Sequence, residues 1–307
     1  MPLNISASPH IRSKINISWV MRQVVIALIP VIIASIILFK ERAIFLILNC
    51  VTTCCLTEKL IAKIREKPSP LKDWSAVVTG LLLAFSLPPT IRWYAASIGS
   101  VFAIAVGKQV FGGLGYNIFN PALIGRAFLV AAYPKMLTSW VEPFSLQAVT
   151  SATPLALRKF SHIITPLSSL FWGNIGGCLG ETSAFCLILG GIYLLVRRIA
   201  DWRVPLSIIA TVGVISSTFF FINPLNGSFL FHLFSGGMLL GALFMATDPV
   251  TTPVTKKGRF VFGIGCGILI MTIRYWSGLP EGVMYSILFM NALTPLINKY
   301  TRPKRFQ

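Results

Sequence analysis

The sequence predicts an all-α integral membrane protein of about ten transmembrane helices, arranged as two inverted five-helix repeats with broken or re-entrant segments. Composition is the first observation behind this prediction. Hydrophobic side chains make up 55% of the 307 residues and charged ones only 12%, whereas a soluble domain carries about 25% charged residues. Lipid must therefore solvate most of the surface. The net charge of +18 sits in short clusters between apolar runs, which is typical of topology signals, so no nucleic-acid partner is expected.

Ten apolar segments are the second observation. Several are shorter than the roughly 20 residues that a straight span needs, so we expect some helices to be broken. A single transmembrane domain is predicted over residues 23–298, between a cytoplasmic segment, 1–22, and a basic tail, 299–307. The apolar segments are residues 23–39, 43–57, 75–88, 94–111, 121–134, 182–196, 204–221, 228–247, 260–273 and 282–297.

The distribution of lysine and arginine predicts the orientation. Eighteen of the 27 basic residues fall in segments on the side of the termini, and seven fall on the opposite side. The positive-inside rule then places both termini in the cytoplasm. The longest loop, residues 135–165, is expected to be external.

A weak internal repeat is the third observation. LAFSLPPT at 83–90 resembles FMATDPVT at 244–251, 161 residues later. IFNPAL at 118–123 faintly resembles LFMNAL at 288–293, which sets Asn120 against Asn291 at an offset of 171. The alternative interpretation is that Pro and Gly simply recur in membrane helices. Five spans separate the copies, so the halves, about 23–134 and 166–298, should be inverted with respect to each other. We expect the Phe111–Pro121 stretch and its counterpart at Gly278–Asn291 to interrupt helices near the membrane interior.

Four stretches are too specific for generic membrane helices: GKQVFGGLGYNIFNPALIGRAF (107–128), AVTSATPL (148–155), GNIGGCLGETS (173–183) and MATDPVTTPVTKKGR (245–259). Backbone this rich in Gly, Asn and Pro should line a cavity where it enters the membrane. Asp248 and Glu181 are carboxylates at the membrane edge, which could either serve a cation path or fix helix ends. The six cysteines have no CxxC spacing, so no metal site is expected, and no catalytic constellation is evident.

In their order, these stretches resemble the family shared by the RnfD proteins and the B subunit of the Na⁺-pumping NADH:quinone oxidoreductase, from about residue 20 to residue 300. The resemblance implies a flavin-attachment motif in which a threonine hydroxyl carries FMN through a phosphoester bond. Here the acceptor would be Thr153, with Thr150, Ser151 and Ala152 as recognition residues. The sequence departs from the family at Gln147, where an aspartate is usual.

The residues around Thr153 suit that role. Pro154 disfavours the helical conformation for Thr153, which should hold it extended. Arg158 and Lys159 are near enough in sequence to offset the charge of a flavin phosphate. The resemblance also implies a second, non-covalent flavin, riboflavin in the sodium-pump relative. We expect it beside the broken segment, with Asn117 and Asn120 either as polar contacts or as helix caps.

The function implied is that of a membrane subunit of an ion-translocating ferredoxin:NAD oxidoreductase, relaying electrons through its flavins. Its expected partners are the other Rnf subunits (A, B, C, E and G), a flavin transferase and the lipid of a bacterial inner membrane. Nicotinamide chemistry would belong to a partner, because no NAD-binding glycine fingerprint is present. One alternative is the quinone-reductase B subunit. That homologue carries a longer N-terminal region, whereas the first apolar span of this sequence begins near residue 23, which favours the Rnf subunit. The other alternative is a urea-channel-like transporter of small solutes, which would not need the TSATPL loop.

Overall fold

The computed structural model describes residues 16–66, 70–144, 148–149, 153–181 and 183–302. Within these residues, the two strands β1 (Trp140–Val141) and β2 (Ala148–Val149) pair in antiparallel fashion, and nearly all other regular structure is helical. The helical elements are α1 (Ile17–Phe39), α2 (Glu41–Ile64), η1 (Pro70–Asp73), α3 (Ser75–Phe85), α4 (Trp93–Ile104), η2 (Ala105–Gln109), α5 (Pro121–Ala132), α6 (Pro134–Leu137), α7 (Pro154–Ala156), η3 (Leu157–Ser161), α8 (Leu167–Trp172), α9 (Ala184–Val196), α10 (Arg203–Ile222), η4 (Pro224–Asn226), α11 (Phe229–Phe234), α12 (Met238–Leu240), η5 (Gly241–Met245), α13 (Lys256–Trp276) and α14 (Val283–Thr301).

The chain is a multi-pass, all-helical membrane protein. By length and apolar composition, four helices of the described chain can cross a bilayer, namely α1, α2, α10 and α13. The pair Pro224–Phe234 and Met238–Met245, bent by 46°, forms either a fifth, broken span or a re-entrant loop. The helices α3, α5 and α9 are apolar but shorter than a straight span.

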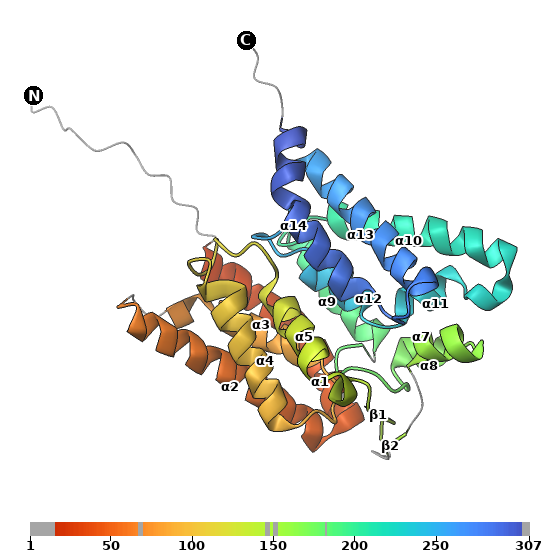
Figure 1. Cartoon of the computed structure of the whole chain (residues 1–307), viewed down its shortest axis with the longest axis horizontal. Helices are drawn as coiled ribbons and strands as arrows, with labels where there is room; N and C mark the ends of the chain where they lie inside the picture. Colours follow the sequence, from red (N-terminus) through yellow and green to blue (C-terminus); the bar gives the residue numbers. More distant parts are fainter. Residues whose placement is uncertain (1–15, 67–69, 145–147, 150–152, 182, 303–307) are drawn as a thin grey trace, which may run out of the picture.

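The two predicted halves have matching orders of elements. The first runs α1, α2, α3, α4 and α5, and the second runs α9, α10, the broken α11–α12, α13 and α14. Figure 1 shows them side by side, the first half in red to yellow and the second in green to blue. LAFSLPPT begins within α3 and FMATDPVT begins within η5, so both copies of the repeat follow the third helix of their half.

The predicted helix breaks are confirmed in the first half and only partly in the second. Residues 110–120 are non-helical, as expected from their glycines and asparagines. In the second half the non-helical stretch covers only residues 277–282, and α14 continues from Val283 through Asn291. The expectation for 283–291 was wrong, because no glycine or proline interrupts the chain there. The marked break of this half lies instead at Ser235–Gly237, between α11 and α12.

The bundle has two distinguishable ends, which α1 connects. At the start of α1, Ser18 Oγ donates to the Lys72 carbonyl at 2.9 Å; we call this the terminal end. At the other end of α1, the Phe144 N–H donates to the Leu38 carbonyl at 3.0 Å, and this is the loop end. In Figure 1 the β1–β2 hairpin lies at the loop end, away from the start of α1 and the end of α14.

Gly190 of α9 marks a very close approach of the two halves. A methyl group there would lie 2.1 Å from the Ala27 carbonyl oxygen of α1, whereas at Gly191 it would meet a tip of the Leu243 side chain at 2.6 Å. A backbone oxygen cannot rotate away, but a leucine side chain can. We expect Gly190→Ala to destabilise the protein by about 3 kcal/mol and Gly191→Ala by no more than about 1 kcal/mol. Thermal unfolding in detergent tests this pair, and equal losses would contradict the packing.

Candidate functional site

Thr153 lies at the loop end and lines a cavity of about 240 Å³. Its backbone is extended, with φ −55° and ψ 157°, which confirms the expected effect of Pro154. The Ala156 N–H donates to Thr153 Oγ1 at 3.4 Å, a long and weak capping contact. The hydroxyl is therefore held at the edge of a cavity by the backbone around it, with little of its hydrogen-bonding capacity used.

The same cavity contains a charged triad that joins the two halves. Arg126 of α5 donates to Glu181 Oε1 at 3.3 Å and to Glu281 Oε2 at 3.0 Å. Glu281 Oε1 also accepts the Gly237 N–H at 2.5 Å, which ties the break between α11 and α12 to the triad. Glu181 thus has an ion-pairing role in this structure. The remaining wall is largely apolar and includes Trp140, Leu155, Met284 and Tyr285.

Arg158 and Lys159 are engaged away from Thr153. Arg158 is buried and donates to the carbonyls of Asn226 at 2.5 Å and Arg274 at 3.3 Å. Lys159 Nζ donates to the carbonyls of Ile273, Arg274 and Leu279 at 2.9–3.2 Å. Both cations therefore bind the carbonyl-rich C-terminal end of α13, where the helix dipole favours positive charge. Their interaction fastens the segment after Thr153 to the second half. The cation lining the Thr153 cavity is Arg126.

The recognition residues Thr150, Ser151 and Ala152, and Gln147 as well, lie outside the described residues. Their expected roles stay predictions. The described residues between Gln147 and Thr150, Ala148 and Val149, pair with Val141 and Trp140 of β1.

A second cavity, of about 70 Å³, lies at the terminal end and is lined by both Asn117 and Asn120. Asn120 has a structural role: its Oδ1 accepts the Ala122 and Leu123 N–H groups that begin α5, and its Nδ2 donates to the Met245 carbonyl at 3.2 Å. The Asn291 side chain contacts Asn120, because its oxygen accepts the Asn120 N–H at 3.1 Å. This is the amide orientation in which both the oxygen and the nitrogen of the Asn291 side chain have hydrogen-bond partners. The two residues that the repeat sets against each other thus touch in the buried interior.

Asn117 is different. Its Nδ2 donates to the Phe119 carbonyl at 3.2 Å, but its buried Oδ1 has no hydrogen-bond partner among the described residues. A buried acceptor without a partner costs about 1–3 kcal/mol, unless a ligand or water satisfies it. Of the two predicted contacts, Asn117 is therefore the one free to accept a hydrogen bond from a ligand.

Asp248 lines the same cavity but fixes its own turn, because its carboxylate accepts the Val250 N–H at 3.2 Å and the Thr251 hydroxyl at 3.3 Å. Two roles were predicted for Asp248, serving a cation path or fixing a helix end, and the structure favours the second. Lys108 of η2 also lines this cavity. Lys108 Nζ donates at 2.5 Å to both Glu58 Oε1 and Ser75 Oγ, and both charged side chains are almost fully buried.

Comparison with known proteins places the fold in a family. The model of the NQR2, RnfD, RnfE family matches residues 4–307. The chain belongs to this family. Its relatives include the D subunit of the Na⁺-translocating ferredoxin:NAD⁺ oxidoreductase complex of Acetobacterium woodii, 45% identical over 98% of this chain and 94% of the relative. The D subunit of the proton-translocating complex of Clostridium ljungdahlii is 42% identical over 98% and 95%. The D subunit of an ion-translocating oxidoreductase complex of Stutzerimonas stutzeri is 38% identical over 96% and 93%.

Two charged groups of this member of the NQR2, RnfD, RnfE family were not predicted from the sequence: Arg126 with its two glutamates, and Lys108 with Glu58. A usable signal was present, because Lys108 and Arg126 are the two cations inside the apolar segments. Ionisable residues at membrane depth are costly and mark functional or structural pairs. Their partners are 50 to 155 residues away in sequence, so spacing alone could not name them.

Proposed function

We propose that the chain is the D subunit of an ion-translocating ferredoxin:NAD⁺ oxidoreductase complex and relays electrons within it. Full-length likeness to three such subunits, at 38–45% identity, supports this proposal. The relatives differ in the ion that their names specify, Na⁺ in one and protons in another, so the likeness favours neither ion. The other Rnf subunits, A, B, C, E and G, are the proposed partners.

FMN, esterified through its phosphate to the Thr153 hydroxyl, is the proposed electron carrier. The arrangement that supports it is a threonine with a nearly free hydroxyl at the rim of a largely apolar cavity, whose charged residues, Arg126, Glu181 and Glu281, are paired with one another. Bound FMN supplies reversible one- and two-electron redox chemistry. In this setting Thr153 would hold the phosphate and the apolar wall would exclude water from the ring, while Arg126 would offset the charges of Glu181 and Glu281 rather than that of the flavin.

The proposed setting is the bacterial inner membrane, with both termini cytoplasmic and the loop of residues 135–165 external, where a flavin transferase would act. The basic residues at the terminal end support this orientation. Reporter fusions after Met136 and after Gln307 should give signals from opposite compartments, and signals from the same compartment would refute it.

Flavin fluorescence of the denatured chain tests the proposed function. The chain is produced with and without a flavin transferase and separated on a denaturing gel, which removes every non-covalent flavin. We expect a fluorescent band only with the transferase. If neither preparation fluoresces and restoring aspartate at Gln147 does not change this, the covalent flavin is refuted. The solute-transporter alternative would then gain support.

A second flavin, held without a covalent bond, is proposed at the terminal-end cavity beside Asn117. The unpartnered Oδ1 of Asn117 supports this, since it can accept the ring N–H of an isoalloxazine. The lining side chains must move aside for a tricyclic ring, because the cavity measures only about 70 Å³. Asn117→Leu should lower the amount of non-covalent flavin released on denaturation at least tenfold and leave the covalent flavin unchanged. Asn117→Asp keeps a hydrogen-bond acceptor, so it should retain more non-covalent flavin than Asn117→Leu does. Equal release from both variants would contradict the site.

A further inference from the structure

A third cavity, of about 490 Å³, opens at the terminal end between α9, α10 and α13. Its lining contains three arginines, Arg198, Arg203 and Arg259, and a single carboxylate, Asp201. Arginine stays protonated in proteins, so these groups leave an excess of two positive charges in the lining. A cavity with such an excess suits a ligand with at least one negative charge.

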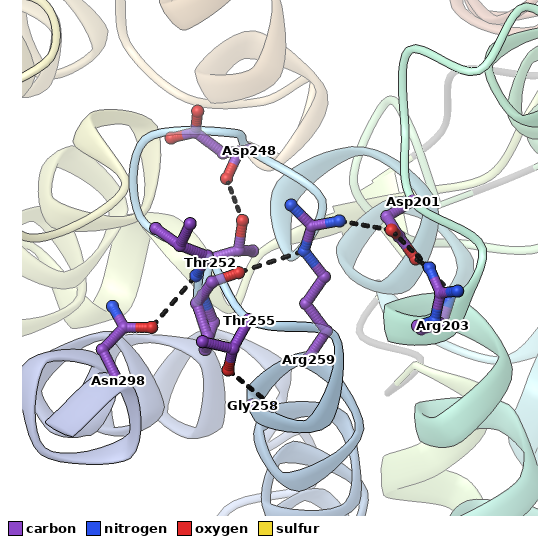
Figure 2. A network of polar contacts seen from close by, with 10 residues as sticks. Asp201, Arg203, Asp248, Thr252, Thr255, Gly258, Arg259 and Asn298 are labelled. Atoms are coloured by element: carbon purple, nitrogen blue, oxygen red, sulfur yellow. Dashed lines mark hydrogen bonds and ion pairs between the residues drawn. The ribbon is translucent and has the colours of Figure 1, made fainter. Parts of the chain in front are cut away.

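Asp201 organises two of these arginines. It accepts the Arg203 N–H at 2.9 Å and the Arg203 guanidinium at 3.0 Å, and it also accepts from the Arg259 guanidinium. Figure 2 shows Arg259 reaching Asp201 from α13 while Arg203 approaches from the start of α10. Burial opposes ionisation of Asp201, but these hydrogen bonds and charges prevail and lower its pKa, so it remains a carboxylate at neutral pH.

Arg198 carries the uncompensated charge. It lines the cavity but forms no ion pair with any residue in the part of the chain that the structure describes, and it is exposed. Its backbone has φ +56°, a conformation that few residues other than glycine adopt. The turn after α9 thus projects a free guanidinium beside two arginines already fixed in position.

The surroundings of the cavity match the edge of a bilayer. Trp202 is half exposed, with the Arg203 guanidinium 4.9 Å from its ring centroid. Tryptophan is enriched at the level of the lipid headgroups. Beside the cavity, Val196 at the end of α9 and Leu206 in the first turn of α10 are exposed, 75% and 51% respectively. Charge in a cavity next to exposed apolar side chains matches a molecule with an anionic head and hydrocarbon tails.

We propose that this cavity binds the headgroup of an anionic phospholipid, with its phosphate between Arg198, Arg203 and Arg259 and its acyl chains along Val196 and Leu206. Arginine forks bind phosphate oxygens in pairs, and basic pockets between membrane helices bind such headgroups. The cavity shares Ile199, Ala200, Thr247 and Pro249 with the terminal-end cavity beside Asn117. A bound lipid therefore covers one wall of that second cavity.

Quenching of Trp202 fluorescence by brominated lipid measures binding at this site. The full chain in a neutral detergent is titrated with brominated phosphatidylglycerol or brominated phosphatidylcholine, and subtraction of a Trp202→Phe variant isolates the Trp202 signal. We expect half-maximal quenching at a concentration of phosphatidylglycerol at least tenfold lower than that of phosphatidylcholine. Equal concentrations would overturn the proposal.

Three variants separate the headgroup site from general attraction to the surface. Arg198→Gln should weaken phosphatidylglycerol binding about fivefold, and because Arg198 has no ion-pair partner among the described residues the fold should be unaffected. Lys63→Gln, the same charge change at an exposed position of α2 outside the cavity, should change binding less than twofold. Asp201→Asn keeps a side-chain oxygen that can accept from Arg203 and Arg259 but removes the competing negative charge, so it should tighten binding. Weaker binding in Asp201→Asn, or equal losses in Arg198→Gln and Lys63→Gln, would overturn the site.

A competition arm distinguishes a lipid from a free anion. Inorganic phosphate at millimolar concentration should leave the quenching by brominated phosphatidylglycerol nearly unchanged when ionic strength is held constant with chloride. Displacement of the lipid by phosphate alone would show a site for a soluble phosphate compound and would overturn the proposal of a phospholipid.

Discussion

Thr153→Val will abolish the covalent flavin and stop electron flow through the assembled complex. Valine keeps the branched shape and removes only the hydroxyl that would form the phosphoester. The structural loss is small, because the removed group accepts only one long contact, from the Ala156 N–H at 3.4 Å. A weak N-cap of this kind contributes about 1 kcal/mol at most. The variant chain should therefore fold, join the complex and lack the flavin.

Matched variants make this result specific. Thr153→Ser retains a hydroxyl and should regain covalent flavin, at least in part. Thr138→Val removes a hydroxyl from the same cavity, where Thr138 donates to the carbonyls of Pro134 and Lys135, and should keep full attachment. Thr150→Val should also keep it, because that position is expected to serve recognition. Full covalent fluorescence in Thr153→Val would exclude Thr153 as the acceptor.

Lys108→Met will cause the largest loss of stability among single substitutions in the terminal-end cavity. The ammonium group donates to Glu58 and to Ser75, both at 2.5 Å, and Glu58 is fully buried. Without Lys108, the one donor to this carboxylate among the residues that the structure describes is the Gln109 amide, at 3.1 Å. An uncompensated buried charge costs about 3–5 kcal/mol, so thermal unfolding in detergent should shift strongly downward.

A double variant separates this effect from lost packing. Lys108→Met combined with Glu58→Leu replaces the whole buried pair by apolar side chains, an exchange that is often close to neutral in other proteins. We expect the double variant to recover most of the stability that Lys108→Met loses. If the double variant is as unstable as the single one, the loss comes from packing around Lys108 and not from the unpaired charge.

Local features of the site could be predicted from the sequence. Pro154 predicted the extended conformation of Thr153, and the glycines and asparagines predicted the break at residues 110–120; the structure has both. Both follow from the conformational limits of one residue and its neighbours. The weak repeat correctly paired Asn120 with Asn291, which meet in the bundle.

Tertiary partners could not be predicted in the same way. Arg158 and Lys159 are next to the flavin motif in sequence, yet their side chains bind the end of α13, more than a hundred residues away. Arg126 belongs to a different motif and lines the Thr153 cavity. Which charges meet depends on how helices pack, and a single sequence carries no direct record of that packing. The weak repeat predicted a break within residues 283–291, but α14 continues through Asn291 because its local composition contains no glycine or proline there.

Peptide mapping of the wild-type chain tests the central claim most directly. Trypsin cleaves after Lys135 and Arg158 and at no site between them, so residues 136–158 form one peptide that contains every residue of the attachment motif. After expression with a flavin transferase, we predict that this peptide gains the mass of one FMN less one water. Fragment ions should locate the gain at Thr153. A peptide that stays unmodified in both the wild-type chain and a Gln147→Asp variant, or a gain located at Thr150 or Ser151, would contradict the assignment of Thr153 as the flavin-bearing residue.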